Sequence, residues 1–220
     1  MLELYTSEGC SSCPPAEKWL SQLKDSPGLW NDFVPVAFHV DYWDHLGWRD
    51  PWAMRKFSDR QREYAAQWRS DTVYTPGFVL NGKDWQWSAK KQAPVSVGLN
   101  AGVLTATSSD TNHWLATFAP IEHAAKKFEV HAALLACGLT SDVKAGENEG
   151  RRLNHDFTVL EVKKAALVGH GDALTGEFTL ASKRSVPGAR LALALWVTEA
   201  GHLEPLQAAG CWLMAPLVSL

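Results

Sequence analysis

The feature that most constrains this chain is a pair of cysteines, Cys10 and Cys13, at the junction of two short segments of different periodicity. The preceding segment, LELYT, is mostly apolar and predicts a strand. In the following segment, apolar residues recur from Ala16 to Leu23 at the i, i+3, i+4, i+7 spacing of an amphipathic helix. The Pro-Pro pair after Cys13 fits a first helical turn, where the missing N–H groups would lack partners anyway. We therefore expect the cysteines at the N-terminus of a helix that follows a strand.

A helix N-terminus stabilises a thiolate, because its free N–H groups and the helix dipole lower the pKa of a thiol from about 8.5. Cys10 comes first and is expected to be the more exposed thiol, which makes it the predicted nucleophile. Cys13 would be the resolving thiol, and Ser11 and Ser12 are supporting positions between the two.

Two other uses of the cysteine pair stay open, namely a structural disulfide and half of a zinc site. Zinc needs two further ligands, and no second paired cysteine or His-x3-His follows. No metal and no other cofactor is therefore predicted.

The composition narrows the class of partner and the compartment. The 220 residues carry a net charge of −3, so no basic surface for nucleic acid is indicated. No apolar run approaches the roughly 18–20 residues of a membrane span. Because the sequence opens on a strand-like segment without a leader pattern, the expected location is the cytoplasm, or the periplasm or cell exterior if a leader is missing. Eleven tryptophans indicate aromatic-rich packing or an aromatic groove in the first half.

The first half alternates between strand and helix patterns. Phe33–Val40 is a nearly continuous apolar run, typical of a strand buried on both faces of a parallel sheet. Residues 53–68 combine many charges with an apolar stripe and predict a second helix. Thr75-Pro76 and an apolar run then lead to Asn81-Gly82, a strong signal for a type I′ hairpin. A return strand and a short, poor helix are expected over Asp84–Pro94.

From about Gly98 the pattern changes to short alternating stretches between polar turns, which is typical of an antiparallel sandwich. We therefore expect an α/β domain over residues 1–97 and an antiparallel β-sandwich domain over residues 98–220. Cys137 and Cys211 each end a predicted strand and are expected to be free and buried. The seven predicted strands are Val103–Thr107, His113–Phe118, Glu129–Cys137, Phe157–Val168, Gly176–Leu180, Leu191–Thr198 and Leu206–Met214.

The order of elements in the first half resembles the thioredoxin fold. That resemblance implies that the Thr75-Pro76 bond is cis and faces the dithiol, where the Thr75 backbone would offer N–H and C=O groups to an extended substrate. It also implies a buried acid on the first strand that moves protons to the resolving cysteine, and Glu3 is the candidate. Such a carboxylate would have a raised pKa and could act as general base. The alternative is a Glu3 side chain on a solvent-exposed edge.

Four longer blocks make the resemblance more specific: ELYTSEGCSSCPP, HVDYWDHLGWRDPW with the later Arg60-Gln61 and Tyr64, VYTPGFVLNG, and GENEGRRL. With them, the chain closely resembles the family catalogued as domain of unknown function 1223. The resemblance implies a thioredoxin-like domain plus a β-sandwich domain, and it supplies no substrate. Members are often exported. This chain departs from the expected pattern at Gly77, where we expect a glutamine.

The second block leaves the C-terminal end of a predicted strand, where open α/β sheets place their functional loops. His39 and Asp41 alternate there, so both side chains are expected on one face, as an acid/base pair, a metal pair or an anchor for the loop. Trp43 and Trp48 are candidate walls of a substrate groove. The GENEGR segment is expected to form a turn or to dock the two domains.

Two functions stay open on this basis. The first is a thiol–disulfide oxidoreductase that acts on a disulfide- or thiol-containing protein or on a small thiol, with Cys10 attacking and Cys13 resolving. The second is a non-catalytic ligand- or protein-binding module, in which the tryptophan-rich loop holds the ligand and the cysteines form a structural or redox-sensing disulfide.

Overall fold

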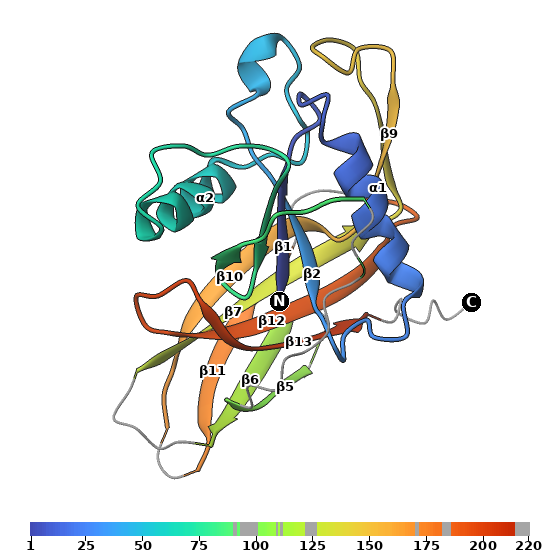
Figure 1. Ribbon diagram of the computed structural model, residues 1–220. Coiled ribbons are helices and arrows are strands. Elements are labelled where there is room, and N and C mark those ends of the chain that lie inside the picture. Colours follow the sequence, from blue (N-terminus) through green and yellow to red (C-terminus); the bar gives the residue numbers. More distant parts are fainter. Residues whose placement is uncertain are drawn as a thin grey trace, which may run out of the picture.

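The computed structural model describes the part of the chain that forms the sheets and helices (Figure 1). Its first half alternates strands and helices as expected. The elements there are β1 (Leu2–Thr6), α1 (Pro14–Gln22), η1 (Leu23–Asp25), β2 (Pro35–His39), η2 (Asp44–Leu46), α2 (Arg55–Gln67), β3 (Gly77–Leu80) and β4 (Lys83–Asp84). The described residues are 1–89, 92, 101–108, 110, 112–121, 127–169, 172–181 and 186–213.

The described residues of the second half contain strands but no helix. These strands are β5 (Gly102–Ser108), β6 (His113–Pro120), β7 (Phe128–Cys137), β8 (Leu139–Asp142), β9 (Arg152–His155), β10 (Thr158–Leu167), β11 (Leu174–Thr179), β12 (Arg190–Glu199) and β13 (Pro205–Trp212).

One eight-stranded mixed sheet runs through the molecule in the order β13-β12-β7-β10-β2-β1-β3-β4. A three-stranded sheet, β11-β6-β5, and the β8–β9 hairpin accompany it. Strands from both halves meet where Thr158 of β10 pairs with Ala37 of β2 in parallel. The two halves thus share a sheet, which the sequence patterns did not indicate. The expected boundary at residues 97 and 98 lies outside the described residues, so the division into two domains stays a prediction.

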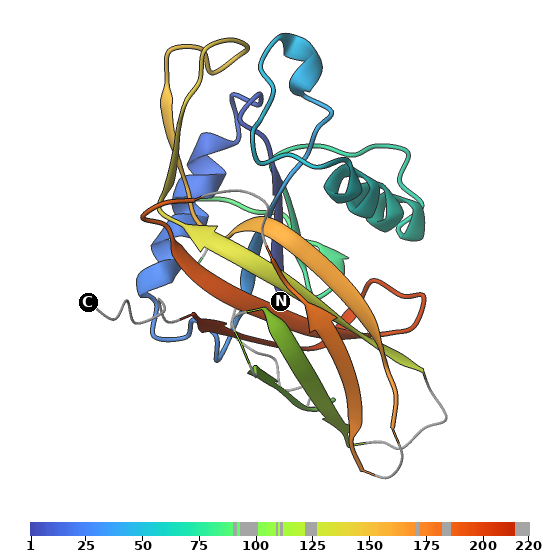
Figure 2. The ribbon, with the colours of Figure 1, turned by 180° about the vertical axis from the view of Figure 1, so that it is seen from behind.

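The strand alternation in β1 and β2 decides which helix each side chain meets. Phe38 packs on Phe57 of α2, with ring centroids 5.0 Å apart, and Tyr5 stacks on Phe38. Thr6, one residue on from Tyr5, instead hydrogen-bonds Glu17 of α1. Because successive side chains in a strand point to opposite faces, α1 and α2 cover opposite faces of this part of the sheet. Figures 1 and 2 show the two helices on either side of β1 and β2.

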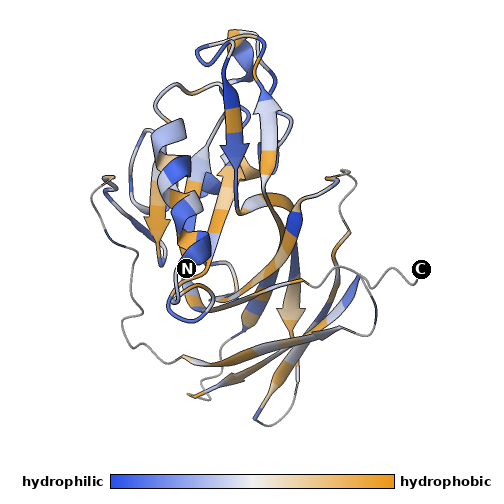
Figure 3. Ribbon diagram, turned by 90° about the vertical axis from the view of Figure 1, so that its right-hand side faces the viewer, coloured by the Kyte–Doolittle hydropathy of each residue, from blue (hydrophilic) through white to orange (hydrophobic). Residues whose placement is uncertain are grey.

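Two hydrophobic cores result. The first lies around β1, β2 and both helices, and the second lies between β5, β6 and β11 and one face of β7, β10 and β12. Every residue of β1 and β2 is buried, as the continuous apolar run of the second strand predicted. Figure 3 shows hydrophobic residues along the strands, whereas α1 alternates hydrophobic and hydrophilic residues around its circumference.

Most expected elements of the first half lie where the sequence placed them. Helix α2 falls within residues 53–68, and Asn81-Gly82 turns between β3 and β4 with φ values of 48° and 81°. The return strand is limited to Lys83–Asp84, and residues 85–89 form no helix. The rest of the expected final helix lies largely outside the described residues.

All seven strands expected in the second half are present, whereas β8 and β9 were not predicted. Their hairpin is short and polar, which gave no strand signal. Cys137 is free and buried as expected. The expectation for Cys211 was wrong in part, because this free cysteine is exposed on β13 at the edge of the sheet. None of the described helices has the length and apolar character needed to cross a bilayer.

A cluster of three aromatic rings, called the aromatic seam here, joins the two halves of the chain. It consists of Trp30, Phe157 and Trp212. Trp30 meets Phe157 and Trp212 edge to face, with ring centroids 5.9 and 5.4 Å apart. Gly210 of β13 faces the Trp30 ring so closely that an added Cβ would lie 2.3 Å from Cε3. The absence of a side chain at residue 210 therefore allows the seam to close.

We expect Gly210→Ala to lower the free energy of unfolding by about 1–3 kcal/mol, because a methyl group forced against the Trp30 ring overpacks the seam. Urea denaturation followed by tryptophan fluorescence would measure the change. The matched control is the double variant with Trp30→Phe, which removes the contacted ring atoms. Equal losses in both backgrounds would show that the clash is not the cause.

Candidate functional site

The two cysteines of the first block form a disulfide at the start of α1. Cys13 is the N-cap residue, and its carbonyl oxygen accepts the N–H groups of Ala16 and Glu17. The Cα atoms of Cys10 and Cys13 are 5.5 Å apart. The helix begins at Pro14, so the structure places both cysteines at the helix N-terminus that the sequence predicted.

The exposure of the cysteines differs from the expectation. Cys10 was expected to be the more accessible thiol, yet its relative exposure is 1% and that of Cys13 is 0%. Three segments lie over this end of the sheet in Figures 1 and 2: the loop between β1 and α1, the loop that contains η2, and the β8–β9 hairpin. Any reaction at Cys10 therefore requires one of the neighbouring segments to move.

The segment before β3 lies directly against Cys10. The Thr75-Pro76 peptide bond is cis, and the Thr75 carbonyl oxygen lies 3.7 Å from the Cys10 sulfur. Ser12 Oγ lies 3.3 Å from the same sulfur and 3.5 Å from the same carbonyl oxygen. Ser12 therefore joins the sulfur and the Thr75 backbone, whereas Ser11 contacts the β8–β9 hairpin through its N–H group.

The two tryptophans expected as groove walls act as ties between segments. Trp43 donates its Nε1–H to Thr75 Oγ1 at 2.8 Å, and Trp48 donates to the Glu8 carboxylate at 2.7 Å. Trp43 also lies across Gly9, where an added Cβ would stand 2.8 Å from the Trp43 Cβ. Glycine at residue 9 is thus what lets the tryptophan-rich loop lie over the cysteine loop.

The GENEGR segment connects the second half of the chain to the cysteines. The side-chain amide of Asn148, which is fully buried, donates to the carbonyl oxygens of Glu8 and Cys10 at 2.8 and 2.9 Å. Glu147 accepts the Ser11 N–H at 2.9 Å. The segment forms a turn, as expected, in which the Glu149 N–H donates to the Gly146 carbonyl oxygen. Its contacts with the cysteine loop also fit the second role considered, docking of the two halves.

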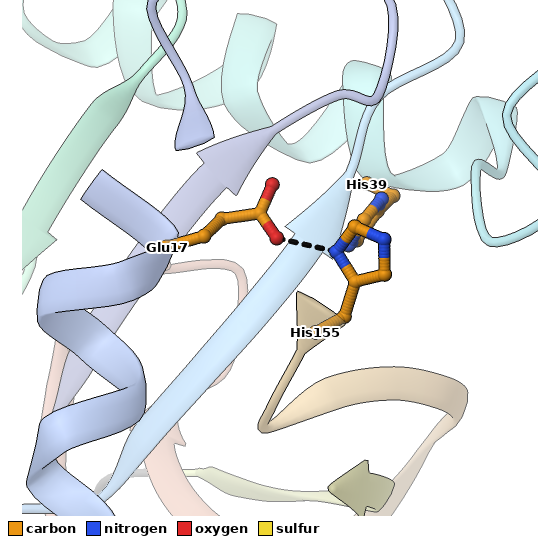
Figure 4. Close-up of side chains that lie close together, drawn as sticks. All are labelled: Glu17, His39 and His155. Carbon is orange, nitrogen blue, oxygen red and sulfur yellow. Dashed lines mark hydrogen bonds and ion pairs between the residues drawn. The ribbon is translucent and has the colours of Figure 1, made fainter. Parts of the chain in front are cut away.

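Beneath the cysteine loop lies a buried ionic network that the sequence did not reveal. His155, at the end of β9, donates from Nδ1 to Glu17 Oε2 at 2.5 Å (Figure 4). Its Nε2 lies 3.0 Å from Glu8 Oε1. Burial alone would lower the pKa of His155, but the charges and hydrogen bonds of Glu17 and Glu8 outweigh it and raise the pKa to about 10. Burial would raise the pKa of Glu17, and His155 reverses this and holds it below its usual value. At neutral pH the imidazolium therefore bridges the two carboxylates.

His39 and Asp41 do not share a face, which corrects the expectation from their alternation. His39, fully buried, donates from Nδ1 to Asp50 Oδ2 at 2.7 Å, on the α1 side of the sheet. Asp41 instead accepts a hydrogen bond from Ser58 of α2. Strand β2 ends at His39, so the strand alternation does not continue to residue 41. Each residue anchors a different part of the loop, and they form neither an acid/base pair nor a metal pair.

Glu3 was expected either to serve the cysteines or to be exposed, and the structure supports neither. Its relative exposure is 1%, and its carboxylate binds Arg60 through two 2.9 Å contacts and Tyr64 at 2.7 Å. Residue 3 has the parity of Tyr5 and therefore faces α2, whereas the cysteines begin α1 on the other face. The buried carboxylate on the helix of the cysteines is Glu17.

The residues that sequence reasoning missed fall into two groups. Glu8 and Asn148 belong to the recognised blocks, so their presence there was a signal that we did not use. His155 and Glu17 carry no motif of their own. Only the tertiary structure brings them together across 138 residues.

Comparisons with known proteins agree with this architecture. Residues 1–198 match the family described as protein of unknown function (DUF1223). The chain belongs to this family. The resemblance inferred from the four sequence blocks is thus confirmed.

A solved structure, Protein AGR_C_4864 from Agrobacterium tumefaciens, is similar with a TM-score of 0.69 and 24% sequence identity. The match covers 100% of this chain and 95% of that one, and it supports the fold alone. No curated protein matches the sequence.

We expect Asn148→Ala to lower the free energy of unfolding by about 2–4 kcal/mol, because the buried carbonyl oxygens of Glu8 and Cys10 would lose their donor. Chemical denaturation would measure the loss. Asn154→Ala on the exposed side of the same hairpin is the control and should change stability by less than about 0.5 kcal/mol. Similar losses in both variants would mean that Asn148 does not hold the cysteine loop.

Proposed function

We propose that this protein is a thiol–disulfide oxidoreductase whose redox centre is the Cys10/Cys13 pair. The observation that carries the proposal is the position of the pair at the N-terminus of α1, with the Thr75 carbonyl oxygen 3.7 Å from the Cys10 sulfur. A helix N-terminus stabilises a thiolate there, which favours both attack by the dithiol and reduction of the disulfide.

In the reducing direction, the Cys10 thiolate attacks one sulfur of a substrate disulfide, and the substrate S–S bond breaks to release a thiolate. The Cys13 thiolate then attacks the Cys10 sulfur of the mixed disulfide. This step forms the Cys10–Cys13 bond and releases the second substrate thiolate. Two electrons pass from the dithiol to the substrate, and the reverse sequence oxidises a substrate dithiol.

Substrate access requires displacement of one of the segments that lie over Cys10, which together are called the cover here. The Trp43–Thr75 hydrogen bond is a tie that can open without disturbing a strand, because both residues lie in loops. Displacement would expose the Thr75 backbone, whose polar groups suit an extended peptide as well as a small thiol. We therefore propose a disulfide- or thiol-containing protein or a small thiol as substrate.

The burial of Cys10 and Cys13 also supports a second candidate function. With relative exposures of 1% and 0%, the disulfide has the inaccessibility of a structural bond. In that case the protein is a non-catalytic binding module, and the cysteines hold the loop that carries Glu8 and the Asn148 contacts. Reaction with thiols in the folded state separates the two candidates.

The proposal includes a finer description of the fold. Residues 1–97 would be a thioredoxin-like domain, supported by the order of β1, α1, β2, α2 and the β3–β4 hairpin. Residues 98–220 would be a β-sandwich domain, supported by the second core between the three-stranded sheet and the large sheet.

We expect Cys13→Ser to form a stable mixed disulfide through Cys10 with glutathione disulfide, and Cys10→Ser to form almost none. Mass spectrometry of the native protein would measure both yields, in a Cys211→Ser background that removes the exposed thiol. The unmodified pair should come to equilibrium with glutathione. A disulfide that no thiol reduces in the folded protein would favour the structural role, and faster alkylation of Cys13 would reverse the assignment.

We expect Thr75→Val to speed alkylation of reduced Cys10 about fivefold, because the lost Trp43 hydrogen bond is worth about 1 kcal/mol to the closed cover. Iodoacetamide labelling of the reduced protein would measure the rate. Thr72→Val, at an exposed residue of the same loop, is the control and should leave the rate unchanged. An unchanged rate in Thr75→Val would show that this contact does not limit access.

A further inference from the structure

Three buried side chains beneath the cysteine loop converge without any sequence motif to connect them. Glu17 of α1, His39 of β2 and His155 of β9 each offer a ligand atom, and these atoms all lie within 4.8 Å of one another. Figure 4 shows the Glu17 carboxylate directed at His155, with the His39 ring beside it. The two imidazole rings meet nearly at right angles, with centroids 5.1 Å apart.

His39 is one of the residues that the network leaves without a full set of hydrogen bonds; His155 Nε2 and Glu8 Oε1, an ion pair 3.0 Å apart, also lack one. The His39 side chain is fully buried, and its Nε2 has no hydrogen-bond partner among the described residues. Leaving a buried polar atom unpaired is costly, so such an atom calls for a partner. In the neutral tautomer whose Nδ1–H donates to Asp50 at 2.7 Å, the lone pair is on Nε2, as in a metal-binding histidine.

Hydrogen bonds also hold the carboxylates of Glu17 and Asp50 in place. Glu17 Oε1 accepts the Thr6 hydroxyl at 2.6 Å, which leaves Oε2 directed at the histidines. The Asp50 carboxylate also accepts the backbone N–H groups of Glu8 and Trp52. Carboxylates that orient an imidazole, and are themselves hydrogen-bonded, are the usual outer contacts of a metal site.

The charges of the cluster leave room for a cation. Glu8, Glu17 and Asp50 place three carboxylates beneath the loop, and among the described residues their ion-pair partners are His155 and His39, with no Lys or Arg. A divalent ion that replaced the proton of His155 would add positive charge to this cluster. Buried carboxylates require compensation by a nearby positive charge.

We propose that Glu17, His39 and His155 bind a divalent transition-metal ion, with Asp50 as the residue that orients His39. The ion would displace to solvent the proton that His155 shares with Glu17, and it would take the place of that hydrogen bond. Two imidazoles and a carboxylate suit Zn²⁺ and its neighbours in the first transition series better than Mg²⁺ or Ca²⁺. The site is enclosed by protein, as structural metal sites are. The ion would fasten β9 of the second half to α1 and β2 of the first.

A cavity of about 390 Å³ lies beside α1, and of the three proposed ligands only Glu17 lines it. Its lining also includes the basic side chains of Lys18, Arg151 and Arg152.

The test uses the full chain with the Cys10–Cys13 disulfide intact, so that neither thiol can bind metal. The protein is treated with EDTA, dialysed and titrated with Zn²⁺ in a calorimeter, and one equivalent should bind. His39→Gln and Glu17→Gln should each weaken binding at least about tenfold, and Asp50→Asn by about 10–100-fold, the loss usual for an outer residue. His113→Gln, in the exposed pair with Asp110, is the matched control and should bind as the unmodified chain does.

A second measurement needs no variant. Co²⁺ in place of Zn²⁺ should give the visible absorption of nitrogen and oxygen ligands, without a sulfur-to-metal charge-transfer band. The proposal is overturned by the absence of stoichiometric binding to the unmodified chain. It is equally overturned by a sulfur band that places the ion on Cys211, or by equal losses in His39→Gln and His113→Gln.

Discussion

The parallel contact between β2 and β10 is the interaction on which the rest of the structure depends. The Ala37 N–H donates to the Phe157 carbonyl oxygen at 2.8 Å, and Thr158 pairs with Ala37. This short contact completes the eight-stranded sheet. It also fixes residues 139–155 above β2, because β9 ends three residues before Thr158. Asn148 and His155 reach the cysteine loop only because this register is kept.

The network beneath the cysteines shows how charges can be buried at tolerable cost. Glu8, Glu17 and Asp50 each accept at least one hydrogen bond in addition to their contact with a histidine. Removal of one partner from a buried ion pair costs about 3–5 kcal/mol, because the other charge is left uncompensated. The burial of Asp50 would raise the pKa of its carboxyl, and His39 reverses the shift. The network therefore ties the two halves strongly and tolerates little substitution.

Local patterns predicted the elements, and long-range contacts decided the site. The apolar run Phe33–Val40, the Asn81-Gly82 turn and the seven alternating strands were recognisable because each depends on neighbours in sequence. The contact expected between Glu3 and the cysteines is not found among its described partners, because the parity of β1 turns that side chain toward Arg60 and Tyr64 of α2. The common face expected for His39 and Asp41 was wrong, because β2 ends between them. His155 could not be found at all, since nothing near it in sequence marks its partners.

The position of Asn148, 138 residues beyond Cys10, has a consequence for the order of events during synthesis. A ribosome releases the N-terminal strands and α1 well before the β8–β9 hairpin emerges, and contacts of such large sequence separation form late. The cysteine pair of the nascent chain is thus uncovered until the β8–β9 hairpin has been synthesised and has folded over it. Oxidation to the disulfide is easiest in that interval. A disulfide formed in that interval would be enclosed by the finished fold.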